Sequence, residues 1–178
     1  MSSFPKKFVV DTNVPKTANY ATDPENIPSD LKDCVVECIA AIKKITERKD
    51  GLVLDSGGEI FGEYLRNLSM SGQPGVGNKF LKWVHDHQWG FPYEDHVVIN
   101  KEGDSYSEFP NTKDLSQFDP ADKKFVAVAK AHPAKPPILQ ATDCKWLGWK
   151  NALEKEGIIV NFLCPDYVAL HYEEKRGV

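Results

Sequence analysis

The sequence has none of the features that would mark a membrane-bound, secreted or repetitive protein. No apolar run approaches the roughly 20 residues that a bilayer-spanning helix needs, and there are no internal repeats or low-complexity tracts. The opening stretch, MSSFPKKFVV, has no apolar signal core before its first strand-like residues. We therefore expect a protein without membrane contacts, located in the cytoplasm.

Cysteine is scarce and does not follow the usual spacing of a metal-binding motif. The four cysteines, Cys34, Cys38, Cys144 and Cys164, include no C-x-x-C pair. Cys34 and Cys38 share a helix face and form at most half of a zinc site, whereas free cysteine more commonly packs as a small core residue. In a reducing compartment we expect no disulfide.

An excess of positive charge is also missing, because 22 Lys and Arg residues face 26 Asp and Glu residues, for a net charge of −4. This balance argues against a general basic nucleic-acid binder. It leaves room for an enzyme that acts on phosphates, since metal-binding acids alone make such a protein acidic.

Strand-like and helix-like segments alternate along most of the chain. Apolar, turn-bounded runs predict strands at 7–11, 51–55, 96–100, 136–142 and 158–163, and helical periodicity predicts helices at 29–47, 59–69, 78–87, 120–132 and 146–157. A turn and a polar loop are expected after residue 11. This order predicts a three-layer α/β/α fold with a central parallel sheet, in a single domain 1–178 with its core at about 7–164. The irregular segment 71–117 is interpreted as an insert or cap.

Three of the expected strands stop on an aspartate: Asp11, Asp55 and Asp143. The carboxyl ends of parallel strands lie at one edge of a sheet, where ligands commonly bind. An aspartate after a strand is also a common turn former. Asp55 precedes the turn-forming Ser56-Gly57-Gly58, so its place in a site stays open.

Two expected helices supply further carboxylates. Asp119 is a natural N-cap before Pro120, and Asp122 shares the apolar face with Phe125 and Ala129. An ionised carboxylate on such a face needs a partner or a metal, although Asp122 also suits a capping box. In the helix over 59–69, Glu63 lies closer to the apolar stripe than Glu59 and is the better candidate to face inward.

Asp11, Glu63, Asp122 and Asp143 thus converge without an obvious arginine or histidine partner. Clustered carboxylates of this kind hold a hard divalent cation, and Mg²⁺ or Mn²⁺ suits oxygen ligands better than zinc does. Such centres hydrolyse phosphodiester bonds by lowering the pKa of bound water and stabilising the leaving oxygen.

With these residues in view, the chain resembles a PIN domain, a nuclease family that includes toxin ribonucleases and RNA-processing enzymes. The matching pieces are Asp11-Thr12-Asn13, Glu63-Tyr64, the DPADKKFVAVA helix with Asp122, and ILQATDCKW with Asp143. The resemblance implies a Mg²⁺- or Mn²⁺-dependent endoribonuclease in which these four acids are both catalytic and metal-binding.

The resemblance also implies supporting residues and partners. Thr12 and Asn13 would orient ligands or water behind the first aspartate, and Lys145 follows Asp143 closely enough to touch a bound phosphate. Lysines and tryptophans near the acids are candidate RNA contacts, with surface lysine and core tryptophan as the alternative: Lys123, Lys124, Lys150, Trp146 and Trp149. RNA is the expected substrate, and a protein inhibitor, as in toxin–antitoxin pairs, and a homodimer are further expected partners.

The long segment 71–117 departs from the small toxin pattern, so the toxin–antitoxin assignment stays open. Two other functions remain as alternatives: a catalytically silent scaffold that binds RNA or a protein, and a DNA-directed nuclease that uses the same acids.

Overall fold

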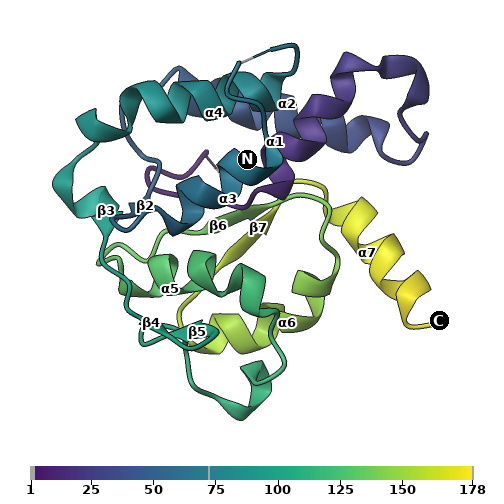
Figure 1. Cartoon of the computed structure of the whole chain (residues 1–178). Coiled ribbons are helices and arrows are strands. Elements are labelled where there is room, and N and C mark those ends of the chain that lie inside the picture. Colours follow the sequence, from purple (N-terminus) through teal and green to yellow (C-terminus); the bar gives the residue numbers. More distant parts are fainter. Residues whose placement is uncertain (1–2, 72, 178) are drawn as a thin grey trace.

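The computed structural model describes residues 3–71 and 73–177 as a mixed α/β fold built around parallel strands (Figure 1). The main sheet has the order β1 (Val9–Val10), β6 (Ile138–Gln140) and β7 (Val160–Phe162), all parallel. β2 (Leu54–Asp55) pairs in parallel with β3 (His96–Val97). A parallel bridge between Phe8 and Leu52 joins the two sheets. The carboxyl ends of all five strands therefore lie on one side, as the sequence predicts.

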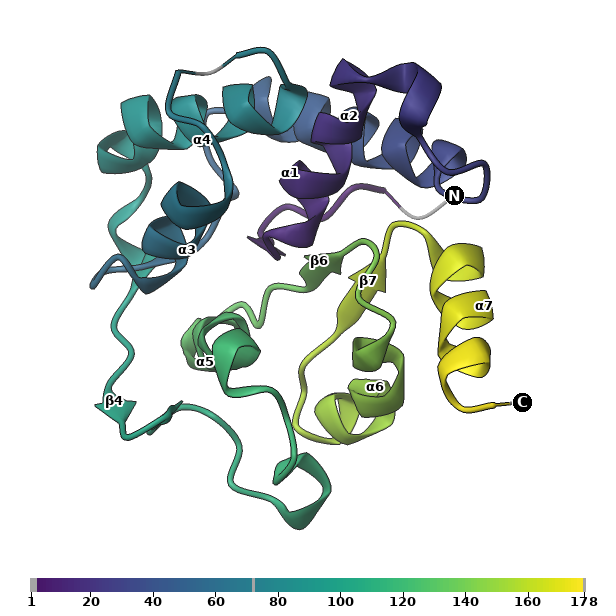
Figure 2. The same ribbon diagram turned by 45° about the vertical axis from the view of Figure 1, so that its right-hand side comes forward.

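Helices lie on both sides of these strands (Figures 1 and 2). One side carries α1 (Asn13–Ala18), α2 (Lys32–Thr46), α3 (Glu59–Asn67) and α4 (Val76–His87). The other carries α5 (Lys123–Ala131) and α6 (Lys145–Lys155), and α7 (Pro165–Lys175) stands beside α6. Among the residues that the structure describes, no helix combines the length and apolar character needed to cross a membrane.

Short elements connect these helices and strands. An antiparallel hairpin consists of β4 (Lys101–Glu102) and β5 (Ser105–Tyr106). Six 3₁₀ turns are described: Asn19–Thr22, Pro24–Asn26, Gln88–Gly90, Tyr93–Asp95, Lys113–Leu115 and Pro120–Asp122.

The segment 71–117, interpreted from sequence as an insert or cap, contributes directly to the main hydrophobic core. Helix α4 buries Phe80, Leu81 and Val84, whose spacing places them on one helix face. Beyond β3, Phe109 and Leu115 join the same core. The described part of this segment therefore packs as an integral part of the fold.

Helix α1 replaces the turn expected after Asp11. Its proline, Pro15, is the third helical residue, where a backbone N–H has no intrahelical partner, so the missing donor does not break the helix. Gly77 in α4 packs against this helix so closely that a Cβ there would lie 1.9 Å from the Pro15 carbonyl oxygen. Gly77 therefore allows α4 to approach α1.

Helix α7 follows the last element that the sequence pattern predicts, the strand at 158–163. It starts at Pro165, whose fixed φ suits the first helical position. Its last residues are strongly charged, and its only buried residue is Val168, so it offers little apolar periodicity. Contact with α6 supports the helix instead.

A disulfide between Cys34 and Cys164 corrects the expectation that the cysteines remain unpaired. The two residues are 130 positions apart in sequence, and their Cα atoms lie 5.3 Å apart. The pairing is invisible in the spacing of the cysteines because only the fold brings the turn after β7 against α2. Cys38 and Cys144 are buried and free.

Candidate active site

Asp11 stands at the carboxyl end of β1 and is buried. Its backbone N–H donates to the Leu139 carbonyl at 3.0 Å, and its Oδ1 accepts the Asn13 N–H at 2.8 Å. The start of α1 therefore fixes the carboxylate by a backbone donor. Asn13, predicted as a supporting residue, acts here through its main chain.

Glu63 approaches Asp11 because its neighbour anchors α3 to β1. The buried Tyr64 hydroxyl donates to the Val10 carbonyl at 2.5 Å, one residue before Asp11. The Glu63 side chain is 17% exposed, against 38% for Glu59. The helical pattern thus identified the carboxylate that turns inward.

Of the two aspartates before α5, Asp119 is a cap and Asp122 is not. Asp119 caps the 3₁₀ turn through Oδ1, which accepts the Ala121 N–H at 3.0 Å, with Pro120 behind it. Asp122 directly precedes α5 but makes no side-chain capping hydrogen bond. The capping alternative for Asp122 is therefore not realised, and its carboxylate is available to the acid cluster.

Asp143 follows β6 and is held at the start of α6. Its Oδ1 accepts the Lys145 N–H at 3.1 Å, and its side chain is largely buried. Asp55, by contrast, uses both carboxylate oxygens in hydrogen bonds within the protein: they accept the Glu59 and Ile60 N–H groups, each at 2.8 Å. Asp55 therefore caps α3 and stabilises the fold.

The pKa shifts of Asp11 and Asp122 indicate that Asp11, Glu63, Asp122 and Asp143 lie close enough for their charges to interact. Burial, together with the charges of Asp122, Glu63 and Asp143, raises the pKa of Asp11 to about 8 against the opposing effect of the Asn13 N–H. Burial also raises the pKa of Asp122 to about 6, assisted by Asp119, Asp143 and Glu63. Without a bound cation, Asp11 therefore retains its proton near neutral pH.

Two lysines enter the acid cluster, where the sequence predicts no arginine or histidine partner. Lys124 Nζ lies 3.2 Å from Glu63 Oε2 and also bonds the Ala121 carbonyl. Lys145 Nζ lies 3.1 Å from Asp119 Oδ2 and 3.8 Å from Asp143 Oδ2. Both lysines were placed near the acids from sequence, but their pairing depends on contacts between separate segments.

Two buried oxygen atoms in the cluster accept or donate no hydrogen bond: Thr12 Oγ1 and Glu63 Oε2. Lys124 Nζ lies within ion-pair distance of Glu63 Oε2, but this contact does not have the geometry of a hydrogen bond. A Thr12 hydroxyl without a hydrogen-bond partner and a Glu63 carboxylate that contacts the Lys124 ammonium, together with a protonated Asp11, fit a hard cation or its water ligands.

The acids do not form a tight cage. Within the described residues, the one group of three His, Cys, Asp or Glu side chains whose ligand atoms all lie within 4.8 Å is a set of cysteines. Mg²⁺ keeps several waters and is commonly held through one or two carboxylates. The arrangement therefore suits a hydrated cation better than one fully enclosed by protein ligands.

A depression of about 550 Å³ adjoins the acid cluster. Its lining combines charge and aromatic surface: Gln117, Asp119, Lys145, Gly148, Trp149 and Tyr172. Trp146 is instead buried and packs edge-on against Phe118. Of the two tryptophans considered for RNA contact, Trp149 is the one that faces this depression.

The other two candidate lysines contact groups outside the four predicted acids. Lys123 lies over the Phe109 ring, and Lys150 pairs with Glu154 on the exposed side of α6. Neither forms a described ion pair with the four predicted acids.

Comparisons of the chain with protein-family models, curated proteins and solved structures found no match.

Proposed function

We propose that this protein is a Mg²⁺- or Mn²⁺-dependent endoribonuclease with a PIN-like, three-layer α/β/α architecture. The observation that carries the proposal is the convergence of Asp11, Glu63, Asp122 and Asp143 from four separate segments, with the pKa of Asp11 raised to about 8. A protein gains nothing in stability from burying like charges. Perturbed carboxylates gathered at the carboxyl ends of parallel strands are typical of a catalytic centre.

The four acids would hold a hydrated cation, and Thr12 Oγ1, which is buried without a hydrogen-bond partner, would bond one of its water ligands. A bound cation of this kind lowers the pKa of water and offsets negative charge on a phosphodiester. The chain's own contribution is orientation: the Asn13 N–H fixes Asp11, and Tyr64 fixes the helix that carries Glu63. Lys145 lies beside Asp119 and Asp143, where it can meet a substrate phosphate.

The depression next to the acids supports a single-stranded substrate. Trp149 and Tyr172 line it together with Lys145, so an aromatic surface and a cation occur side by side. Aromatic side chains stack on unpaired bases, whereas bases within a duplex are not available for stacking. We therefore propose that a nucleotide flanking the cleaved bond lies against Trp149.

One observation favours a second function, a PIN-like scaffold that binds RNA or protein without cutting it. Lys124 pairs with Glu63, and a lysine in that place supplies charge that a cation would otherwise provide. A DNA-directed nuclease would use the same acids. The protein inhibitor, the homodimer and the cytoplasmic location stay predictions.

Cleavage of labelled single-stranded RNA and DNA tests the proposal. Wild type, Asp11→Asn, Asp143→Asn and Glu63→Gln would be assayed in Mn²⁺, in Mg²⁺ and in chelator, with Glu59→Gln as the matched control one turn away on α3. We expect metal-dependent RNA cleavage that Asp11→Asn and Asp143→Asn reduce at least 100-fold and that Glu59→Gln retains.

Each other result has a definite meaning. RNA binding by the folded wild type without cleavage in either metal would support the scaffold. Preferred cleavage of the DNA strand would support the DNA-directed nuclease. Unchanged cleavage by Asp143→Asn would overturn the four-acid centre.

A further inference from the structure

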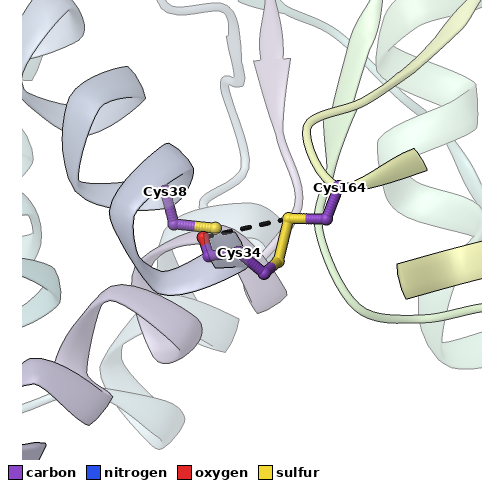
Figure 3. A group of neighbouring side chains, drawn as sticks. All are labelled: Cys34, Cys38 and Cys164. Carbon is purple, nitrogen blue, oxygen red and sulfur yellow. Dashed lines mark hydrogen bonds between the residues drawn. A yellow bond between two sulfur atoms is a disulfide. The ribbon is translucent and has the colours of Figure 1, made fainter. Parts of the chain in front are cut away.

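Three cysteines meet on the side of the fold that holds α2 and the start of α7 (Figure 3). Cys34 and Cys38 lie one turn apart on α2, and Cys164 immediately precedes α7. Their sulfur atoms all lie within 4.8 Å of one another, and all three residues are buried. The group involves none of the residues of the proposed nuclease centre.

The disulfide uses only two members of this group. Cys34 and Cys164 are bonded, while Cys38 stays a free thiol beside them. A disulfide alone needs no third sulfur at this distance. A thiolate metal site does, because sulfur ligands at about 2.3 Å from one zinc ion lie roughly 3.8 Å from each other.

We propose that the reduced protein binds one zinc ion through Cys34, Cys38 and Cys164, and that the Cys34–Cys164 disulfide is the alternative, metal-free state of the same site. Two ligands at i and i+4 on a helix and a third from a distant turn are a common way to build a zinc site. Soft thiolates favour zinc or copper(I) over the Mg²⁺ and Mn²⁺ proposed for the carboxylates.

A cavity of about 280 Å³ provides room for the fourth ligand. Cys34 and Cys164 line it together with Leu163, Pro165, Tyr167 and four acids, Asp30, Asp33, Glu37 and Asp166. Water or one of these carboxylates can complete the tetrahedron, since both are ordinary zinc ligands. The His171 ring nitrogen Nε2 lies 2.8 Å from Asp30 Oδ2, so Asp30 is already engaged.

The two states interconvert by a balanced exchange. A dithiol reductant gives two electrons and two protons to the Cys34–Cys164 bond and itself becomes a disulfide, which leaves three thiols in the group. Zinc then displaces one proton from each thiol that it binds. In the reverse direction, a disulfide oxidant takes two electrons from the Cys34 and Cys164 thiolates and two protons from water to become a dithiol, zinc is released, and Cys38 takes up one proton to become a thiol again.

Either state would connect α2 to the turn before α7. The disulfide links these segments covalently, and zinc would link them through shared ligands. We therefore expect the reduced protein to lose stability when zinc is removed and to regain it on addition of zinc.

Cobalt(II) is a suitable probe, because thiolate ligation gives it charge-transfer absorption that carboxylate ligation does not. The full chain, reduced with a phosphine, would be titrated with cobalt and then with zinc. Cys38→Ala and Cys164→Ser test the site, and Cys144→Ala is the matched control, since Cys144 is buried and free but outside the group. Circular dichroism would show that each variant is folded.

We expect one cobalt per reduced chain with thiolate absorption, displacement by zinc, and at least a 10-fold loss of affinity in Cys38→Ala and Cys164→Ser. The Cys144→Ala protein and the Asp11→Asn protein should bind as wild type does. The oxidised protein should show no thiolate absorption with cobalt. Folded, reduced wild type that gives no such absorption, or Cys38→Ala that retains full affinity, would overturn the proposal.

Discussion

Lys124 Nζ lies 3.2 Å from Oε2 of Glu63, inside the group of carboxylates at the carboxyl ends of the parallel strands. The Lys124 side chain is 8% exposed, which is rare for lysine unless it is paired. Its positive charge offsets part of the repulsion among the acids. A bound divalent cation would take over this role, so Lys124 and the cation stabilise the same cluster.

Replacing Lys124 by methionine tests this relationship. Without a cation, Lys124→Met should lower the free energy of unfolding by about 3 kcal/mol, because it leaves the Glu63 carboxylate largely buried without a partner. Manganese should then raise the Tm of this variant more than that of wild type. Lys150→Met is the control, since the exposed pair of Lys150 with Glu154 should contribute less than about 1 kcal/mol. Equal behaviour of the two variants would contradict the assignment.

The raised pKa values predict how stability depends on pH. In the metal-free folded protein the pKa of Asp11 is about 8 and that of Asp122 about 6, whereas an aspartate in the unfolded chain titrates near 3.9. The folded state therefore binds more protons than the unfolded state between these values, and the contribution of both groups to stability falls as pH rises through this range.

Asp11→Asn isolates this effect, because the variant has no proton to lose at that position. Its Tm in chelator should exceed that of wild type at pH 8 by several degrees, and the difference should shrink toward pH 5. Differential scanning calorimetry across this pH range is the measurement. A difference that is independent of pH would mean that Asp11 does not titrate as the structure indicates.

Replacing Thr12 by valine tests whether its hydroxyl contributes to cleavage rather than to stability. The Thr12 hydroxyl is buried without a hydrogen-bond partner, so an isosteric methyl should leave the metal-free protein unchanged or up to about 1 kcal/mol more stable. RNA cleavage should nevertheless fall at least 10-fold if the hydroxyl orients water in the loaded centre. Thr46→Val is a control, because the Thr46 hydroxyl, at the last residue of α2, donates to the Ile42 carbonyl within the same helix. Full activity in Thr12→Val would remove this residue from the site.

Trp149→Ala tests the substrate depression. Loss of one stacking surface should weaken binding of single-stranded RNA by about 1–3 kcal/mol, measured as a raised Kd or KM. Trp149→Phe should restore part of the affinity, because it keeps an aromatic face and the contact with Phe118. Trp89→Ala, at an exposed aromatic residue that lines a different pocket, is the control. Equal loss in both alanine variants would mean that the depression has no special role.

Asp95, just before β3, forms a buried ion network with Lys7 and with His132 at the end of α5. Disrupting this network should lower stability without changing the activity of the folded protein. Asp95 is fully buried and lies 2.9 Å from His132 Nε2 and 2.5 Å from Lys7 Nζ. Because His132 Nδ1 accepts the Ala134 N–H, Nε2 carries the proton and donates to Asp95. Asp95→Ala should cost roughly 3–5 kcal/mol of stability.

The cleavage rate of the folded Asp95→Ala fraction should be unchanged, since none of these groups belongs to the acid cluster. Urea unfolding gives the stability, and the cleavage rate per folded molecule gives the activity. A specific loss of activity at full folding would place this network in the mechanism.

Local patterns in the sequence predict the elements that carry the four acids. Apolar, turn-bounded runs before Asp11 and Asp143 mark strand ends, and helical spacing points Glu63 inward. Parallel strands then require that these ends share one side of the sheet. These inferences succeed because they depend on local periodicity and on strand direction, which neighbouring residues in the chain already encode.

Contacts between segments far apart in the chain depend on how the elements pack in three dimensions. Pairing of Lys124 with Glu63 and of Cys34 with Cys164 spans about 60 and 130 residues, and neither has a local signature. Helix α1 packs against α2 and α4, which follow it in the chain. Asp55 resembles Asp11 in sequence but caps α3, since the turn at Gly58 aims the Glu59 and Ile60 N–H groups at its carboxylate. Local periodicity therefore indicates most of the strands and helices, whereas long-range packing assigns the partners of the charged and sulfur-bearing side chains.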